Sequence, residues 1–183
     1  MLLKFIKKFV KYIFALLLFI TFIVLGYLFI YGNFHKVDNN VYRSAQLFSF
    51  NMPYYVNKYH IKSILDLRGA TDSQSYKDEI NISKEYNITH YTYSIGTADI
   101  QTMKIMNKIV DIIKNSPKPI LIHCKSGADR TSLATALYLY SINKDKIAPK
   151  AFSLEYLHFP WLGSKTKAMD ESFDKYVKQH PHN

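Results

Sequence analysis

The chain has a single cysteine, Cys124, among its 183 residues. One thiol excludes an intramolecular disulfide framework, and it equally excludes metal sites that need several cysteine ligands. Arginine is almost as scarce, because the sequence has three arginines against 21 lysines. A chain that otherwise uses lysine is expected to keep arginine where a planar, forked donor matters. The three positions are Arg43, Arg68 and Arg130.

Several other patterns are missing. The formal net charge is +10, yet no dense basic run with interleaved aromatic residues stands out, which argues against nucleic-acid binding. The sequence has no internal repeat and no low-complexity linker. His158, His180 and His182 are not spaced as a set of metal ligands, so we expect neither a metal nor another cofactor.

Residues 12–31 form a long uncharged stretch dominated by Leu, Ile and Phe. As a helix rising about 1.5 Å per residue, such a stretch covers about 30 Å, the hydrocarbon thickness of a bilayer. A cleaved signal peptide would have a shorter apolar core and a cleavage site of small residues. The sequence from Gly26 to Asn33 offers no such site, so we expect an uncleaved transmembrane anchor.

The flanking charges predict how this anchor is oriented. Residues 1–11 contain four lysines and no acidic residue, whereas Lys36 is the one basic residue that follows closely. The positive-inside bias keeps the N-terminus cytoplasmic and sends the domain across the membrane, to a periplasmic or outward-facing side. Residues 32–183 retain a basic excess, which is either a solubilising surface or an attraction to anionic lipid head groups.

We predict four segments: a basic cytoplasmic N-terminus at 1–11, the anchor at 12–31, a linker at 32–40 and one folded domain at 41–183. In the domain, short apolar runs predict strands, and apolar residues on a 3.6-residue spacing predict helices. The expected strands lie near 41–46, 64–68, 88–93 and 119–122, and the expected helices near 52–60, 75–86, 100–114 and 132–140. This alternation predicts an α/β sandwich with a mainly parallel sheet flanked by helices.

Residues 123–131, His-Cys-Lys-Ser-Gly-Ala-Asp-Arg-Thr, connect the last of these strands to a helix. Strand, tight loop and helix point successive backbone N–H groups at one spot, and such a nest binds a phosphate-sized anion. Cys124 begins the loop, where these groups favour a thiolate that can attack phosphorus and form a phosphocysteine. Arg130 ends it with a guanidinium that can hold two phosphate oxygens.

The remaining loop positions have supporting roles. Gly127 permits positive φ and a close approach of the backbone to the oxygens, and Thr131 places a hydroxyl where it can stabilise the thiolate when it leaves. Lys125 either adds charge to the floor of the pocket or points to solvent, and His123 is expected to be structural. The phosphate-binding residues are expected to be Lys125, Ser126, Gly127, Ala128, Asp129 and Arg130.

This stretch resembles the Cys-x5-Arg signature of the cysteine-dependent protein tyrosine phosphatase superfamily, in the extended form His-Cys-x-x-Gly-x-x-Arg-Thr. Such a match is informative because its strand–loop–helix context is the expected one. Tyr42–Gln46 and Leu65–Arg68 are similar to the Tyr-Arg-Ser-x-Gln opening and the Leu-x-Leu-Arg strand of bacterial and fungal dual-specificity-like phosphatases. The resemblance covers about residues 41–176 and implies that superfamily's fold and phosphocysteine chemistry without a metal.

Arg43 and Arg68 lie within these similar segments, and two interpretations of them remain open. Either they contact the substrate, or one of them pairs with Asp66 inside the fold.

The general acid that protonates the leaving oxygen is less clearly marked. Many superfamily members supply an Asp from a mobile Trp-Pro-Asp loop, and this chain has no such tripeptide. Asp99 lies in the corresponding loop, where it equally fits the start of a helix. Asp129 lies in the catalytic loop, in an ending similar to that of myotubularin-like and atypical bacterial lipid phosphatases. We prefer Asp129 as the acid and keep Asp99 as the alternative.

Three functions follow from this resemblance and from the anchor. The first is a membrane-anchored phosphatase that acts on phosphotyrosine or has dual specificity toward phosphorylated proteins. The second applies the same chemistry to a lipid or inositol phosphate, which the anchor, the basic domain and Lys125 favour. The third is a phosphate-binding module without turnover, against which the intact Cys124, Arg130 and Thr131 argue.

Overall fold

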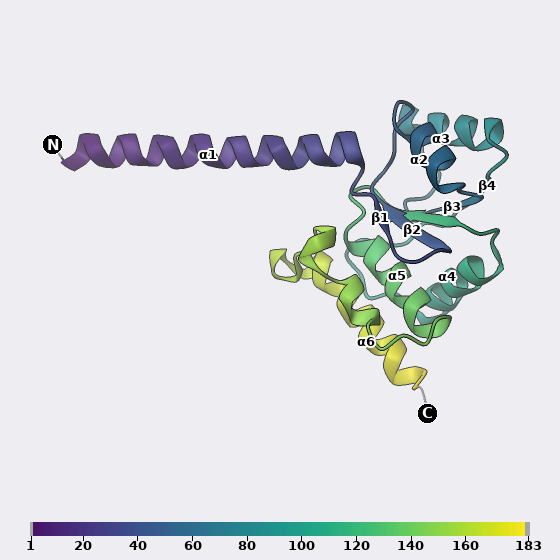
Figure 1. Ribbon diagram of the computed structural model, residues 1–183. Helices are drawn as coiled ribbons and strands as arrows, with labels where there is room; N and C mark the ends of the chain where they lie inside the picture. Colours follow the sequence, from purple (N-terminus) through teal and green to yellow (C-terminus); the bar gives the residue numbers. More distant parts are fainter. Residues whose placement is uncertain (1, 182–183) are drawn as a thin grey trace.

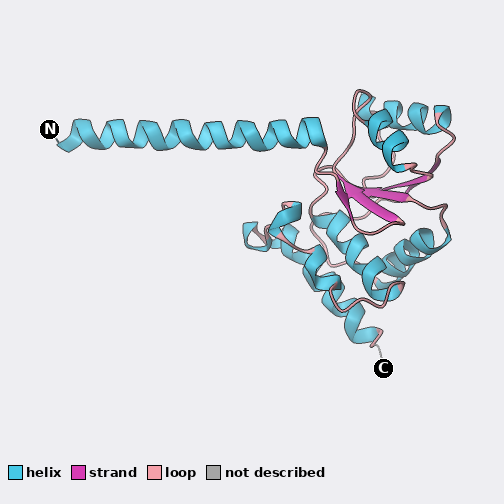
Figure 2. Cartoon of the chain, in the orientation of Figure 1, coloured by secondary structure: helices cyan, strands magenta, loops and turns pink. Residues whose placement is uncertain are grey.

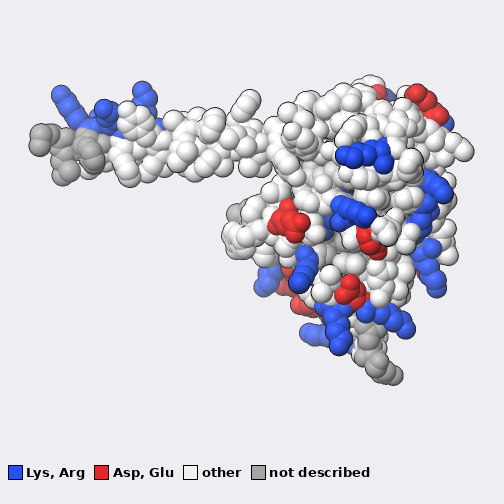
Figure 3. Space-filling view, viewed as in Figure 1, with Lys and Arg blue, Asp and Glu red and all other residues white. Residues whose placement is uncertain are grey.

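A single long helix and an α/β domain make up the computed structural model, which describes residues 2–181 (Figure 1). Helix α1 runs without interruption over Leu2–Tyr31. Its segment Ile6–Tyr31 is long and apolar enough to cross a membrane. In the space-filling view the basic side chains of this helix gather at its N-terminal end, and the remaining visible surface is uncharged (Figure 3).

A five-stranded sheet lies at the centre of the domain, in the order β1-β2-β5-β3-β4. Its strands are β1 (His35–Lys36), β2 (Val41–Ser44), β3 (Ser63–Asp66), β4 (Thr89–Thr92) and β5 (Ile120–His123). All neighbouring strands pair in parallel except β1, which pairs antiparallel with β2. The three central strands are buried throughout, as is typical of parallel strands covered on both faces.

Helices cover both faces of this sheet (Figure 2). One face carries α2 (Met52–Tyr59) and α3 (Gln74–Glu85), and the other carries α4 (Met103–Asn115), α5 (Asp129–Ser141) and α6 (Ser164–Gln179). Between α5 and α6 lie three short 3-10 helices, η1 (Ala148–Ala151), η2 (Leu154–Tyr156) and η3 (Pro160–Leu162). The predicted mixed fold with a mostly parallel sheet flanked by helices is therefore confirmed.

Two hydrophobic cores hold these layers together. The apolar stripe predicted for α4 buries Met106, Ile109 and Ile113 against α5 and the sheet. On the opposite face, Val56 and Ile82 pack with the sheet in a second core. Since both cores contact the same three central strands, the carboxyl ends of these strands are held rigidly in place.

Residues 32–40, the segment predicted as a linker, pack against the domain. Gly32 and Asn33 have positive φ values of 65° and 44°, the left-handed conformation that ends many helices. Asn33 is buried, and its Nδ2 donates to the carbonyl oxygens of Ser126 at 3.1 Å and Tyr156 at 3.2 Å.

Side chains from α2 and the residue before it satisfy the last carbonyl groups of α1. Asn51 Nδ2 donates to the carbonyl oxygens of Phe29 and Ile30, and the Tyr55 hydroxyl donates to that of Tyr31. Terminal helix carbonyls have no partner within the helix, so these bonds connect α1 directly to the domain.

Candidate active site

The loop of residues 124–128 connects β5 to α5. Because β5 lies between β2 and β3 and is parallel to both, the loop leaves the sheet at the carboxyl ends of its central strands. Open parallel sheets bind their ligands at this edge.

The backbone of the loop is oriented by hydrogen bonds to its carbonyl groups. Four donors bond to four consecutive carbonyl oxygens of the loop. Gln46 N donates to Lys125 O (3.2 Å), Asn33 Nδ2 to Ser126 O (3.1 Å), Arg43 Nη2 to Gly127 O (2.9 Å) and Ser132 N to Ala128 O (2.8 Å). Within residues 2–181, the backbone N–H groups of 125–130 donate no hydrogen bond to any acceptor. Carbonyls held on the outside and N–H groups left without acceptors form an anion-binding nest.

Gly127 is required by the packing of this loop. Its φ is +71°, and a Cβ atom placed there would lie 2.6 Å from the backbone nitrogen of Ala45 and the carbonyl carbon of Ser44. Any other residue would combine an unfavourable backbone conformation with a clash against β2.

A pocket of about 340 Å³ opens in front of the loop. Its lining residues are Leu28, Thr97, Cys124, Lys125, Ser126, Asp129 and Arg130. Five of these are predicted site residues, so the fold brings them together around one space. Thr97 comes from the loop between β4 and α4, and Leu28 comes from the last turns of α1. The sequence pattern did not identify either of these two.

Arg130 and Thr131 occupy the first turn of α5. The Arg130 Nη1 atom donates to the carbonyl oxygen of Leu67 at 3.1 Å, which directs the guanidinium toward the end of β3. Thr131 is fully buried, and within the described residues its hydroxyl has no hydrogen-bond partner.

The two candidate acids occupy different positions. Asp129 lines the pocket, whereas Asp99 is exposed in the loop before α4 and is absent from the pocket lining. The backbone carbonyl of Asp99 accepts a hydrogen bond from Gln101 Nε2. Between the two carboxylates, the geometry therefore favours Asp129.

His158 contacts the catalytic loop through Asp129, although the sequence pattern gave it no role. Its Nδ1 lies 2.9 Å from Asp129 Oδ1, and its Nε2 lies 2.9 Å from Asp170 Oδ2. An imidazolium satisfies both contacts, because both ring nitrogens then donate. Burial lowers the pKa of His158, but the hydrogen bonds and charges of the two carboxylates outweigh burial and raise it.

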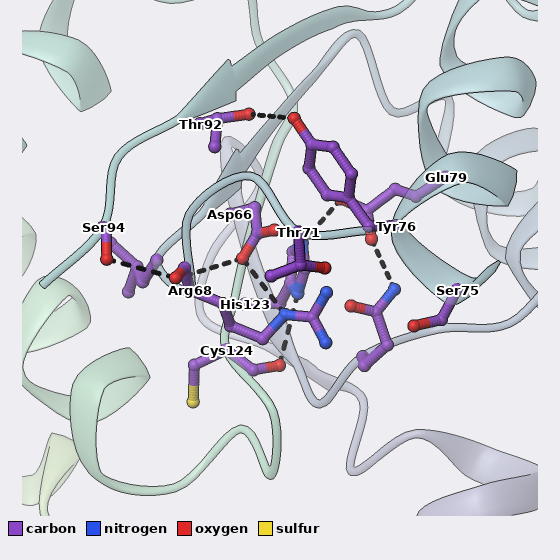
Figure 4. Close-up of polar contacts among 12 residues, drawn as sticks. Asp66, Arg68, Thr71, Ser75, Tyr76, Glu79, Thr92, Ser94, His123 and Cys124 are labelled. Atoms are coloured by element: carbon purple, nitrogen blue, oxygen red, sulfur yellow. Dashed lines mark hydrogen bonds and ion pairs between the residues drawn. The ribbon is translucent and has the colours of Figure 1, made fainter. Parts of the chain in front are cut away.

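His123 belongs to a second network, behind Cys124. Its Nε2 lies 2.9 Å from Glu79 Oε1, and its Nδ1 lies 3.3 Å from the carbonyl oxygen of Cys124. Glu79 also contacts His90 Nε2 at 2.6 Å and accepts a hydrogen bond from Gln46. Figure 4 shows the Cys124 sulfur pointing away from this network.

The pairing of His123 and Glu79 shifts both pKa values. Burial lowers the pKa of His123, but the charge and hydrogen bond of Glu79 raise it to about 9. Burial raises the pKa of Glu79, but the charge of His123 and the hydrogen bonds from His123 and His90 hold it far below its usual value. Both residues are therefore charged near neutral pH, as a buried ion pair.

Arg43 supports the loop from behind and does not line the pocket. It is completely buried, and it donates to Gly127 O, to Ser132 Oγ at 2.8 Å and to Ala151 O at 3.0 Å. Its guanidinium also lies 3.8 Å from the centre of the Tyr156 ring. Burial lowers the pKa of Arg43 to about 10, so it remains charged at neutral pH.

Arg68 pairs with Asp66, at 3.4 Å between Nε and Oδ1. The sequence left open whether Arg43 and Arg68 contact the substrate or whether one of them pairs with Asp66, and Arg68 forms that internal pair. Asp66, Glu79 and His123 place possible metal-ligand atoms within 4.8 Å of one another. Within this group Glu79 is paired with His123, and Asp66 is paired with Arg68.

The fold and the loop together define a class of protein. A thiol and a guanidinium at the two ends of a phosphate-sized nest, on a mainly parallel sheet with helices on both faces, are the features of the cysteine-based phosphatases. The family model for the tyrosine phosphatase family matches residues 29–177, and the chain belongs to this family.

Several solved structures share this fold. The crystal structure of P. aeruginosa TpbA has a TM-score of 0.56 at 15% identity, over 78% of this chain and 84% of that chain. The core catalytic domain of the S. cerevisiae PP-IP phosphatase SIW14 has a TM-score of 0.57 at 23% identity, and the match covers 81% of this chain and 92% of that chain. PTPMT1 in complex with PI(5)P has a TM-score of 0.53 at 13% identity, and the match covers 80% of this chain and 98% of that chain. No curated protein sequence matches the chain.

Proposed function

We propose that this chain is a membrane-anchored phosphatase that hydrolyses phosphate monoesters through a phosphocysteine on Cys124. The supporting observation is the loop of residues 124–130, with its carbonyls bonded to the scaffold and its N–H groups without acceptors. A bound phosphate would accept hydrogen bonds from these N–H groups and from Arg130, and its phosphorus would face the thiolate.

The first chemical step transfers the phosphoryl group to the enzyme. The Cys124 sulfur forms a bond to phosphorus as the bond from phosphorus to the leaving oxygen breaks, and Asp129 gives that oxygen a proton. Arg130 holds two equatorial oxygens as the phosphoryl group flattens. The alcohol or phenol then departs, and a phosphocysteine remains.

The second step releases inorganic phosphate. The Asp129 carboxylate takes a proton from water, the water oxygen attacks phosphorus, and the sulfur–phosphorus bond breaks. The unpaired hydroxyl of Thr131 is positioned one residue after Arg130 in the buried first turn of α5. We assign it the role of donating to the departing thiolate.

His158 is assigned a positioning role through Asp129. It contacts Oδ1 of the carboxylate at 2.9 Å, which fixes the orientation of the side chain. Its imidazolium form would also stabilise the carboxylate that remains after proton transfer.

The anchor and its orientation are the second part of the proposal. Helix α1 supplies the apolar length, and its lysines all precede residue 12. This charge pattern favours a cytoplasmic N-terminus and an outward-facing domain.

The first candidate substrates are phosphotyrosyl or dual-specificity protein substrates, which the family assignment supports. TpbA has been solved with pTyr, SIW14 is named a PP-IP phosphatase, and PTPMT1 has been solved with PI(5)P. The position of Leu28 in the pocket lining favours the second candidate, a lipid phosphate at the membrane surface. A non-catalytic phosphate-binding module is the candidate of another class.

The test is phosphate release by the full-length protein in mixed micelles, with Cys124→Ser as the control. The panel comprises phosphotyrosyl and phosphoseryl peptides, phosphatidylglycerophosphate and phosphoinositides. We expect release from at least one substrate and its loss in Cys124→Ser. Folded protein that binds phosphate but releases none from any substrate would favour the binding module.

A further inference from the structure

Exposed aromatic side chains gather beside the C-terminal end of α1. Phe29 of α1 lies 5.0 Å from both Phe48 and Phe50, measured between ring centres. Phe29 is 54% exposed, and Phe50 and Tyr54, which follow in the loop and at the start of α2, are 56% and 57% exposed. Soluble domains seldom leave such a contiguous group in water, and groups of this kind mark interaction sites.

A second exposed aromatic group comes from the segment between α5 and α6. Trp161 of η3 is 66% exposed, and its ring lies 5.7 Å from that of Phe159. Figure 1 shows this yellow-green segment projecting from the domain on the side on which the long helix extends. The same segment carries His158, which contacts Asp129 in the pocket.

The length of α1 indicates the depth at which its C-terminal residues and the pocket lie relative to the bilayer. Lys11 is the last charged residue before Lys36. If Lys11 marks the near edge of the hydrocarbon, a helix rising about 1.5 Å per residue crosses about 30 Å and reaches the far edge near Tyr31. Leu28 then lies just inside that far edge. Since Leu28 lines the catalytic pocket, the mouth of the pocket lies at the depth of the lipid head groups.

The junction between helix and domain keeps this placement fixed. The side chains of Asn51 and Tyr55 donate to the last carbonyls of α1, and Asn33 donates to the catalytic loop. A domain held in this way cannot move far from the membrane surface on a flexible tether. Trp and Tyr favour the membrane–water interface, where an apolar ring and a polar group are both accommodated.

We propose that Phe29, Phe48, Phe50, Tyr54 and Trp161 form an interfacial surface that rests in the bilayer around α1, so that the catalytic pocket opens among the head groups and takes phosphate monoesters carried by membrane lipids. This inference rests on the proposed function, since it names the substrate class of the same pocket. The exposed Lys125 at the pocket adds a positive charge that suits an anionic surface.

The single tryptophan makes the placement directly measurable. The full-length protein is reconstituted in vesicles of phosphatidylcholine with a minority of phosphatidylglycerol, and the fluorescence of Trp161 is recorded. Some vesicles contain lipid brominated near the ester end of the acyl chains, others lipid brominated near the methyl end. We expect strong quenching by the first, weaker quenching by the second, and protection from aqueous acrylamide.

A matched variant moves the only tryptophan away from the proposed surface. In the double variant Trp161→Phe, Ile147→Trp, the probe replaces an apolar residue that is 47% exposed and lies beyond the C-terminal end of α5. This tryptophan should be quenched by acrylamide and unaffected by brominated lipid. Equal acrylamide quenching at the two positions, with no effect of bromine on Trp161, would overturn the proposed surface.

Substrate class is tested in the same vesicles. A lipid phosphomonoester, phosphatidylglycerophosphate, is compared with a water-soluble phosphotyrosyl peptide. We expect the ratio of lipid to peptide turnover to exceed one and to fall about tenfold in the double variant Phe50→Ser, Trp161→Ser, because neither position then buries an aromatic ring in the interface. Preferred turnover of the peptide would overturn the lipid assignment. Absence of turnover with either substrate would contradict the proposed function instead, whatever the fluorescence result.

Discussion

Two buried histidines lie on opposite sides of the catalytic loop, and both form ion pairs with carboxylates. His123 lies behind Cys124 and pairs with Glu79, which is itself buried. His158 lies on the pocket side and pairs with Asp129 and Asp170, whose side chains are 36% and 32% exposed. In both cases the carboxylates outweigh burial and raise the pKa of the histidine.

The difference lies in what each carboxylate can reach. Among the described residues, the hydrogen-bond partners of Glu79 are the scaffold residues His90, His123 and Gln46, so its pairing contributes to stability. Asp129 reaches the pocket, so its pairing contributes to the chemistry of the site. Under the proposed function, the same pairing of a histidine with a carboxylate therefore serves the fold behind Cys124 and the reaction in front of it.

Of the substitutions that test this comparison, Asp129→Asn should have the largest effect, a loss of catalytic rate. The amide cannot deliver a proton, so kcat for an alkyl or phenyl phosphate should fall about 10³-fold, within the range for general acids. A substrate with a good leaving group, such as p-nitrophenyl phosphate, should lose much less. Asp99→Asn is the matched control and should retain activity. A larger loss in Asp99→Asn than in Asp129→Asn would reverse the assignment of the acid.

Glu79→Gln tests the ion pair between Glu79 and His123 behind Cys124, called the rear pair, and should lower the stability of the fold. Removing one charge leaves His123 buried without its partner, which destabilises the fold by about 3 kcal/mol. Denaturant unfolding of the full-length protein in detergent measures this loss. The folded fraction should keep its kcat within a few-fold, in contrast to Asp129→Asn. Unchanged stability together with a large loss of kcat would contradict the division between the two sides.

The rear pair also predicts how stability depends on pH. His123 has a pKa of about 9 in the folded protein against 6.5 when unfolded. Its contribution is therefore complete below pH 6.5 and is lost as the pH rises toward 9, by about 3 kcal/mol from the linkage relation. Glu79 acts in the opposite direction, since its lowered pKa gives stability above about pH 4.5 that is lost in acid. Unfolding midpoints between pH 6.5 and 9 should decline in the wild type and stay flatter in Glu79→Gln.

His158→Gln should have the smallest effect, on the pocket side. A less well-held Asp129 should lower kcat about tenfold. Without the imidazolium charge, the alkaline limb of the pH–rate profile should move to higher pH. His180→Gln, at the C-terminal end of α6, is the control and should leave the profile in place. A lower kcat with no shift of the alkaline limb would show that His158 has only a structural role.

Strands β2 to β5, helices α2 to α5 and the catalytic loop could be predicted from the sequence because each is encoded locally, whereas β1 and α6 were not among the predicted elements. The apolar run before Cys124 and the small residues after it specify strand, loop and helix within about twenty residues, and the observed α5 and β5 follow that pattern. Helix α4 was likewise expected from its apolar stripe and spans Met103–Asn115. Patterns of period 2 and 3.6 carry this information.

The partners of the loop could not be predicted in this way, because they depend on the fold. His158 is 29 residues from Asp129, and Glu79 is 44 residues from His123. No spacing rule connects such positions, and a lone histidine carries no periodic signal. Leu28 was predicted to lie in the anchor, and its place in the pocket depends on how residues 32–34 turn the chain back onto the domain.

The most direct test of the central account is to trap the phosphoenzyme. The full-length protein is mixed with excess p-nitrophenyl phosphate, quenched rapidly, digested and analysed by mass spectrometry for a phosphorylated peptide. The account predicts one phosphoryl group on Cys124, a burst of nitrophenol that matches the enzyme concentration if hydrolysis of the intermediate is slow, and neither signal in Cys124→Ser. Steady turnover with the phosphoryl group on another residue, or turnover that persists in Cys124→Ser, would contradict it.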